Sequence, residues 1–274
     1  MTPSAPRPRL SKRHRTLAIC GLPLLALFAV TALAPLPISV AQPGLTANVL
    51  GYNKGKPVVT LSGAKGESGR ASGGGNGGKL LMTTIAATQP DATIRLPEVV
   101  ENWFRTDRAA MPRDAVYPGG GTTKEIEERN EGEMKQSQQA AIKAALRQQH
   151  RSPDDVRVTL RLADVGGPSA GLLFSLGIID KLDGGDGGGL TGGRTIAGTG
   201  TIKADGTVGP VGGVPLKTRA AKRDGATVFL VPKAECGDAQ AELPKGLRLV
   251  PVATLDGALK SLKALKDGGR VPRC

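Results

Sequence analysis

Two short stretches of small residues constrain this chain most, because each one frames a residue that can do chemistry. Ser169 lies within GGPSAG (166–171), and Lys217 ends the stretch PVGGVPLK (210–217). The run from Ser169 to Leu182 is apolar on nearly every face, which predicts a buried helix. The turn before it places Ser169 at or near the start of that helix, where unpaired backbone amides favour negative charge and could hold an oxyanion.

Ser169 and Lys217 suit the roles of nucleophile and base. Serine needs a neighbouring base, and the chain has only two histidines, His14 and His150, so a Ser–Lys pair is the natural arrangement. Lys217 falls on the small-residue side of a helix expected over 216–223, where desolvation would lower its pKa. The alternatives are that Ser169 only caps its helix and that Lys217 extends past its alanine neighbours to water.

The order of predicted elements indicates a mixture of strands and helices. Alternating or continuous apolar runs predict strands over 57–64, 80–87, 156–162, 195–202, 207–211, 228–231 and 247–252. Asp205-Gly206 is a strong hairpin signal between two of them. Helical spacing predicts helices over 124–150, 169–182, 216–223 and 255–265. A Gly/Ser-rich loop over 65–79 separates the first two predicted strands. This order is typical of α/β or α+β proteins.

The N-terminal region predicts contact with a membrane. Residues 1–16 are basic, no charged residue follows until after Asn53, and Leu17 to Leu36 is long and apolar enough to span a bilayer. We therefore expect segment 17–41 to be a single-pass anchor with the N-terminus inside and the remainder outside the cytoplasm. The alternative is a signal peptide cleaved near Ala41, which would release a secreted protein.

Composition narrows the classes of partner. The net charge of +13 suggests acidic partners, but aromatic residues make up only 3% of the chain and no nucleic-acid motif occurs, so we expect no nucleic-acid binding. No cluster of ligand residues has metal-binding spacing, and no cofactor is expected. Cys236 and Cys274 could form a disulfide if this part lies outside the reducing cytoplasm; otherwise they are two free thiols.

Taken together, these motifs resemble the proteolytic domain of the Lon proteases. The resemblance rests on GPSAG at 167–171, Thr-Gly at 199–200 and VxPVGGxxxKxxxA at 208–221, and EGEMKQS at 131–137 is similar to a helix of the same domain. It implies an α+β fold of mixed sheets with packed helices. The segment after the apolar run is similar to that of the membrane-anchored bacterial members, although the five residues between His150 and Val156 leave no room for their PDZ module.

The resemblance also implies roles for individual residues. Ser169 would be the nucleophile and Lys217 the base, and Thr199 would orient the pair. Gly166 and Gly167 would support the serine turn, Gly166 standing where ATP-dependent members commonly have Asp.

The expected organisation follows: a cytoplasmic tail (1–16), the anchor or signal segment (17–41), a β-rich N-terminal part of the protease region (42–150) and a Ser–Lys catalytic domain (151–274). The expected function is an ATP-independent serine endopeptidase acting on extracytoplasmic peptides or proteins, and a homo-hexameric ring is implied by family resemblance. The alternative is a non-catalytic, anchored protein-binding module derived from such a protease.

Overall fold

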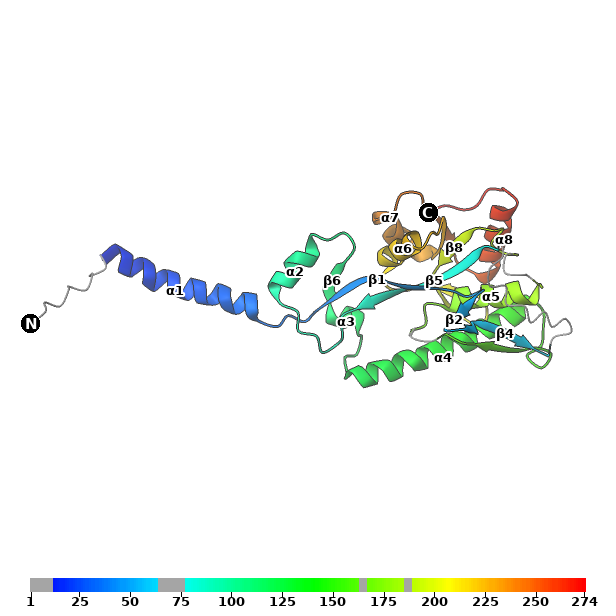
Figure 1. Cartoon of the computed structure of the whole chain (residues 1–274), viewed down its shortest axis with the longest axis horizontal. Coiled ribbons are helices and arrows are strands. Elements are labelled where there is room, and N and C mark those ends of the chain that lie inside the picture. Colours follow the sequence, from blue (N-terminus) through cyan, green and yellow to red (C-terminus); the bar gives the residue numbers. More distant parts are fainter. Residues whose placement is uncertain (1–11, 64–76, 163–166, 185–188) are drawn as a thin grey trace, which may run out of the picture.

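The computed structural model describes residues 12–63, 77–162, 167–184 and 189–274. Helix α1 (Lys12–Leu33) projects away from the body of the molecule, as Figure 1 shows at the blue end of the chain. The body is built around a six-stranded sheet with helices on its two faces. Most of the predicted Gly/Ser-rich loop over 65–79, and Gly166, lie outside the described residues.

The main sheet has the strand order β12-β11-β8-β5-β1-β6. Four neighbours, β12, β11, β8 and β5, run parallel, whereas β1 is antiparallel to both β5 and β6. The strands are β1 (Ile38–Asn48), β5 (Lys79–Ala87), β6 (Ala109–Pro112), β8 (Thr195–Gly198), β11 (Val228–Pro232) and β12 (Arg248–Val252). A mixed sheet with packed helices confirms the α+β class.

Strand alternation divides the interior into two cores. Along β5, Leu80 and Met82 belong to the larger core, while Leu81 between them belongs to the smaller one. The larger core packs against α5 (Gly171–Leu182), α4 (Thr123–Gln148) and α8 (Leu255–Lys266). The smaller core packs against α6 (Val214–Arg223) and α7 (Cys236–Ala241). Helices α5 and α6, which follow Ser169 and carry Lys217, therefore lie on opposite faces of the sheet.

Short elements complete the body. Helix α4 begins with a capping box, in which Thr122 and Glu125 exchange hydrogen bonds, close to its predicted start. The two-stranded sheets pair β2 (Tyr52–Asn53) with β3 (Lys56–Pro57), β4 (Val59–Ser62) with β7 (Arg157–Leu160), and β9 (Thr201–Ile202) with β10 (Val208–Gly209). The remaining elements are α2 (Leu96–Trp103), α3 (Arg113–Val116) and the 3₁₀ turn η1 (Lys233–Glu235).

The N-terminal region differs from the predicted segment 17–41. Helix α1 starts at Lys12, inside the expected tail, and ends at Leu33, and Ile38 already belongs to β1. Ser39 and Ala41 are fully buried in the sheet. Among the helices of the described residues, none is both long enough and apolar enough for a membrane crossing. The transmembrane helix expected from the sequence is therefore not supported.

The chain end is tied to the smaller core. Cys236, at the start of α7, forms a disulfide with Cys274, with a Cα–Cα distance of 5.2 Å. Both cysteines pack against the buried residues of that core. Cys20, on α1, is an exposed free thiol.

Candidate active site

Ser169 lies in the connection from β7 to α5, two residues before the first helical residue, Gly171. Two contacts from α4 hold this connection in place. Ser137 Oγ donates to the Pro168 carbonyl oxygen at 2.9 Å, and the Asn130 carbonyl accepts from the Gly167 amide at 3.2 Å. Gly167 adopts φ = +85°, a backbone conformation that favours glycine. The serine side chain is half-buried.

The approach of this loop to its neighbours depends on Gly171. A Cβ at that position would lie 2.8 Å from Ile202 Cγ2 and 3.0 Å from Ser137 Oγ. The small residues around Ser169 thus let the helix start fit between α4 and β9. This is the physical reason for the small-residue stretch that the sequence shows.

Lys217 lies in the first turn of α6 and points into the protein. Gly213 caps the helix with φ = +68°, and the Lys217 side chain is only 3% exposed. Burial lowers the pKa of Lys217 from 10.5 to about 8, because the charged amine loses its water. The predicted core-facing orientation is present, and the side chain does not extend to water.

Thr199 connects the lysine to the serine loop. Its hydroxyl accepts a hydrogen bond from Lys217 Nζ at 3.2 Å and donates one to the Ser169 carbonyl oxygen at 3.2 Å. The Gly200 amide donates to the same carbonyl at 2.9 Å. Thr199 itself is fully buried, directly after β8. The Thr199 hydroxyl therefore links the Lys217 amine to the backbone of the serine loop, although these segments are far apart in the sequence.

The prediction of unpaired amides at the helix start is wrong at two positions. The Leu172 amide donates to the Gly200 carbonyl at 3.1 Å, and the Gly171 amide donates to the Pro168 carbonyl at 3.4 Å. At Leu172 the cause is the Thr-Gly segment after β8, whose Gly200 carbonyl reaches the first turn of α5; at Gly171 it is a turn within the serine loop itself. An oxyanion would need other donors, or movement of these groups.

Sequence reasoning missed Glu235. Its Oε1 accepts from the Val211 amide at 2.8 Å, within the stretch that leads to Lys217. Its negative charge raises the pKa of Lys217, opposing the larger effect of burial. A signal was available: Glu235 and Thr199 follow the carboxyl ends of the adjacent parallel strands β11 and β8, which lie at one edge of the sheet.

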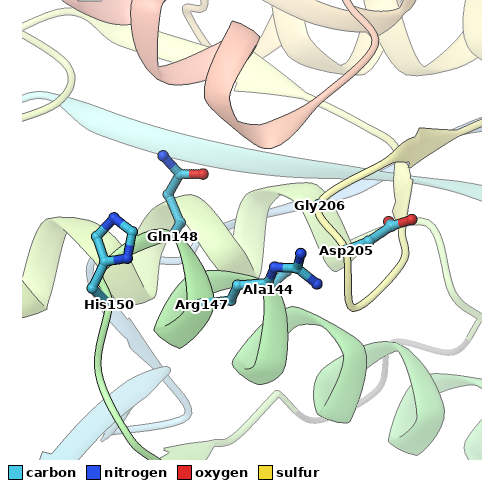
Figure 2. A pocket seen from close by; sticks show the side chains of 6 residues that line it. All are labelled: Ala144, Arg147, Gln148, His150, Asp205 and Gly206. Carbon is cyan, nitrogen blue, oxygen red and sulfur yellow. The ribbon is translucent and has the colours of Figure 1, made fainter.

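A pocket at the end of α4 is separate from this site. Figure 2 shows His150, Gln148 and Arg147 on one side of it and the hairpin residues Asp205 and Gly206 on the other. Its lining includes none of the residues of the Ser169–Lys217 region. His150 therefore does not serve that site as a base here. Within the parts of the chain that the structure describes, no group of three or more potential ligands could hold a metal ion.

The comparisons with known proteins agree with the motif spacing. Residues 133–264 match the model of the Lon protease (S16) C-terminal proteolytic domain. Lon protease of Chloroflexus aggregans is 36% identical over 97 residues, which cover 34% of this chain and 11% of that protein. Lon protease of Azospirillum brasilense is 38% identical over 98 residues, which cover 34% of this chain and 11% of the relative.

A third relative, Lon protease 1 of Myxococcus xanthus, is 35% identical over 112 residues, covering 39% of this chain and 13% of that protein. The chain thus spans little more than a tenth of the length of the curated relatives it matches. The matched region contains Ser169, Thr199 and Lys217. Over residues 133–264, this chain is therefore similar to the proteolytic domain of the Lon proteases.

Proposed function

We propose that this chain is a serine endopeptidase in which Ser169 is the nucleophile and Lys217 the general base. The observation that carries the proposal is the burial of Lys217 together with its hydrogen bond to Thr199, which also binds the serine loop. An amine buried in this way can be neutral near physiological pH, and a neutral amine can accept a proton.

The reaction proceeds in two halves. Neutral Lys217 accepts the proton of the Ser169 hydroxyl as Oγ attacks the carbonyl carbon of a peptide bond. The protonated lysine then returns its proton to the leaving amine, and an acyl ester remains on Ser169. Water, deprotonated by the same amine, releases the acid and restores the serine. These steps consume only substrate and water, so we propose that cleavage requires no nucleotide.

Substrates follow from the site's construction. The Ser169 side chain is half-buried, so we expect that a folded domain would have to open locally before a peptide bond could reach it. We therefore propose flexible peptides or unfolded protein segments as substrates. A homo-hexameric ring stays a prediction from the family.

The location outside the cytoplasm is also our proposal. The disulfide between Cys236 and Cys274 suits an oxidising compartment. Large apolar side chains along α1 stand exposed, among them Leu22, Leu25 and Phe28. We propose that these side chains attach the chain to a membrane.

Cleavage near Ala41 fits the structure less well. The residues Ile38–Ala41 pair with Ala109–Pro112, so a cut there would remove the part of β1 that holds β6. We therefore propose that the chain keeps α1. Cell fractionation tests the attachment: the full chain should sediment with membranes, and a chain starting at Pro35 should not. Equal sedimentation of both forms would contradict a role for α1.

Labelling with a fluorophosphonate tests the dyad directly, because the probe reacts only with an activated serine. We expect modification at Ser169, located by peptide mapping, and its loss in Ser169→Ala and Lys217→Met. Lys222→Met is the matched control, since Lys222 is an exposed lysine on the same helix. Labelling that persists in Lys217→Met would eliminate the lysine as base.

The occupied amides of Gly171 and Leu172 favour a second candidate, a binding module that keeps the dyad residues without using them. A folded wild-type chain that resists the probe under all conditions, yet binds unfolded polypeptide in a fluorescence anisotropy titration, would establish this second function.

A further inference from the structure

We propose that Glu235 is a positioning residue for Lys217, holding the turn that begins α6 and placing a negative charge near the lysine amine. The inference deepens the proposed function and rests on it for its catalytic meaning. The contacts that carry it belong to Glu235 itself, and they can be tested whether or not the chain cleaves peptides.

The first observation is a hydrogen bond to the turn. Glu235 Oε1 accepts from the Val211 amide at 2.8 Å, and Val211 lies two residues before Gly213, the cap of α6. The Gly213 carbonyl in turn accepts the Lys217 amide at 3.1 Å. Glu235 therefore fixes the segment whose backbone determines where Lys217 enters the site.

The second observation is the other carboxylate oxygen. Glu235 Oε2 is buried and has no hydrogen-bond partner among the described residues. A buried carboxylate oxygen without such a partner is costly unless an opposite charge compensates it. Lys217 supplies that charge, since its amine lowers the pKa of Glu235 while burial raises it. The two groups thus stabilise each other's charged forms.

Few charged groups influence this pair. Among the described residues, the charge of Glu235 affects the pKa of Lys217, and the charges of Lys217 and Asp238 affect the pKa of Glu235. Asp238 is exposed and lies three residues further on, in α7. It offers a matched control: an acidic group near Glu235 that bears on the carboxylate and not on the lysine.

The residues before and after Glu235 in the sequence are both fixed by the fold. It ends η1, which follows directly from the buried strand β11. The next residue, Cys236, is joined to Cys274 by the disulfide. A three-residue turn has little structure of its own, so these two anchors set the direction of the glutamate side chain.

The direct test is the titration of the Lys217 amine in the full chain, followed by NMR of ¹⁵N-labelled lysine side chains and assigned by difference from Lys217→Met. Replacing Glu235 by Gln keeps an acceptor for the Val211 amide and removes the charge. We expect the midpoint of the Lys217 titration to fall by about one pH unit in Glu235→Gln, the order of effect of losing a nearby opposite charge. Asp238→Asn should leave it in place.

Acylation of Ser169 by the fluorophosphonate probe supplies the functional readout. In Glu235→Gln the rising limb of the rate–pH profile should move to lower pH with the NMR midpoint. In Glu235→Ala the limiting rate should also fall, by about tenfold, because the turn loses its acceptor and the base its position. Glu235→Asp, which keeps the charge, should recover part of that rate.

The two proposals fail in distinguishable ways. A Lys217 midpoint and a profile that are the same in Glu235→Gln and in the wild type would overturn the role of Glu235, whatever the protease activity. A shifted midpoint in a chain that the probe never labels would retain the electrostatic coupling and reject the peptidase. An unfolded Glu235→Ala chain would leave the Gln and Asp variants to decide.

Discussion

Loss of the Cys236–Cys274 disulfide should cost this fold much of its stability. The bond joins residues 38 positions apart in the sequence. Closing a loop of that length in the unfolded chain removes conformational entropy equivalent to about 4 kcal/mol at 25 °C. Measured losses for removed native disulfides are about 2–5 kcal/mol, and serine would in addition bring polar groups against the apolar residues that both cysteines contact.

The measurement is urea unfolding of the double variant Cys236→Ser, Cys274→Ser, monitored by far-ultraviolet circular dichroism without reductant. Cys20→Ser is the control, because Cys20 is an exposed free thiol on α1. We expect a fall of about 4 kcal/mol in the double variant and none in the control. A difference below about 1 kcal/mol would refute the loop-closure argument, as would a wild-type chain whose unfolding midpoint does not respond to reductant.

Further predictions concern the site. Because the pKa of Lys217 is about 8, acylation should rise about tenfold from pH 6 to pH 7 and level off above about pH 8; a flat profile would contradict a lysine base. Lys217→Met should abolish labelling yet raise the unfolding free energy at pH 7 by up to about 3 kcal/mol, because it removes a buried charge. The free energy of unfolding of the wild type should rise between about pH 8 and pH 10.5, since in this range the unfolded chain binds one more proton than the folded chain. Thr199→Val should slow acylation and lower stability by about 1–3 kcal/mol in denaturant titrations, since the buried amine loses its acceptor, whereas Thr199→Ser should preserve both. Gly171→Ala should lower stability by about 1–3 kcal/mol, because its Cβ would lie 2.8 Å from Ile202 Cγ2, whereas Gly132→Ala, in open space on α4, should be neutral or stabilising.

The helices that follow Ser169 and carry Lys217 could be predicted because their signals are local. Ser169 precedes a run that is apolar on nearly every face, and Lys217 is the cation on the alanine side of its helix. Each signal needs only the 3.6-residue period and the size of the neighbours. The structure places Lys217 in the interior for this reason, with a lowered pKa that follows from burial.

Strand β1 could not be predicted from the same kind of signal. Its first residues continue the uncharged run that begins in α1, so no change in polarity marks the point where the helix ends at Leu33. Its alternation is also interrupted, since the pairing with β5 shifts register between Pro43 and Thr46. What defines Ile38–Asn48 as a strand is its pairing with β5 and β6, distant in the sequence.

The surroundings of Ser169 and Lys217 also depend on contacts between residues that are distant in the sequence. The amide of Leu172 donates to the carbonyl of Gly200, which lies 28 positions further along the chain. Glu235 reaches Val211 across 24 positions. Both contacts arise where parallel strands end at one edge of the sheet, and strand order is a property of the whole fold, which no window of residues contains.

Burial of Lys217 has opposite consequences for stability and chemistry. The desolvation that lowers the pKa of Lys217, and that would let the amine act as a base, also makes its charged form unfavourable inside the folded chain. The nearby carboxylate of Glu235 reduces that cost, but it also holds the proton on the lysine more tightly. We expect the balance between these effects to depend on how firmly the hydrogen bond to Val211 and the disulfide at Cys236 fix Glu235. In our proposal, the basicity of Lys217 therefore depends on how the C-terminal part of the chain packs against the start of α6.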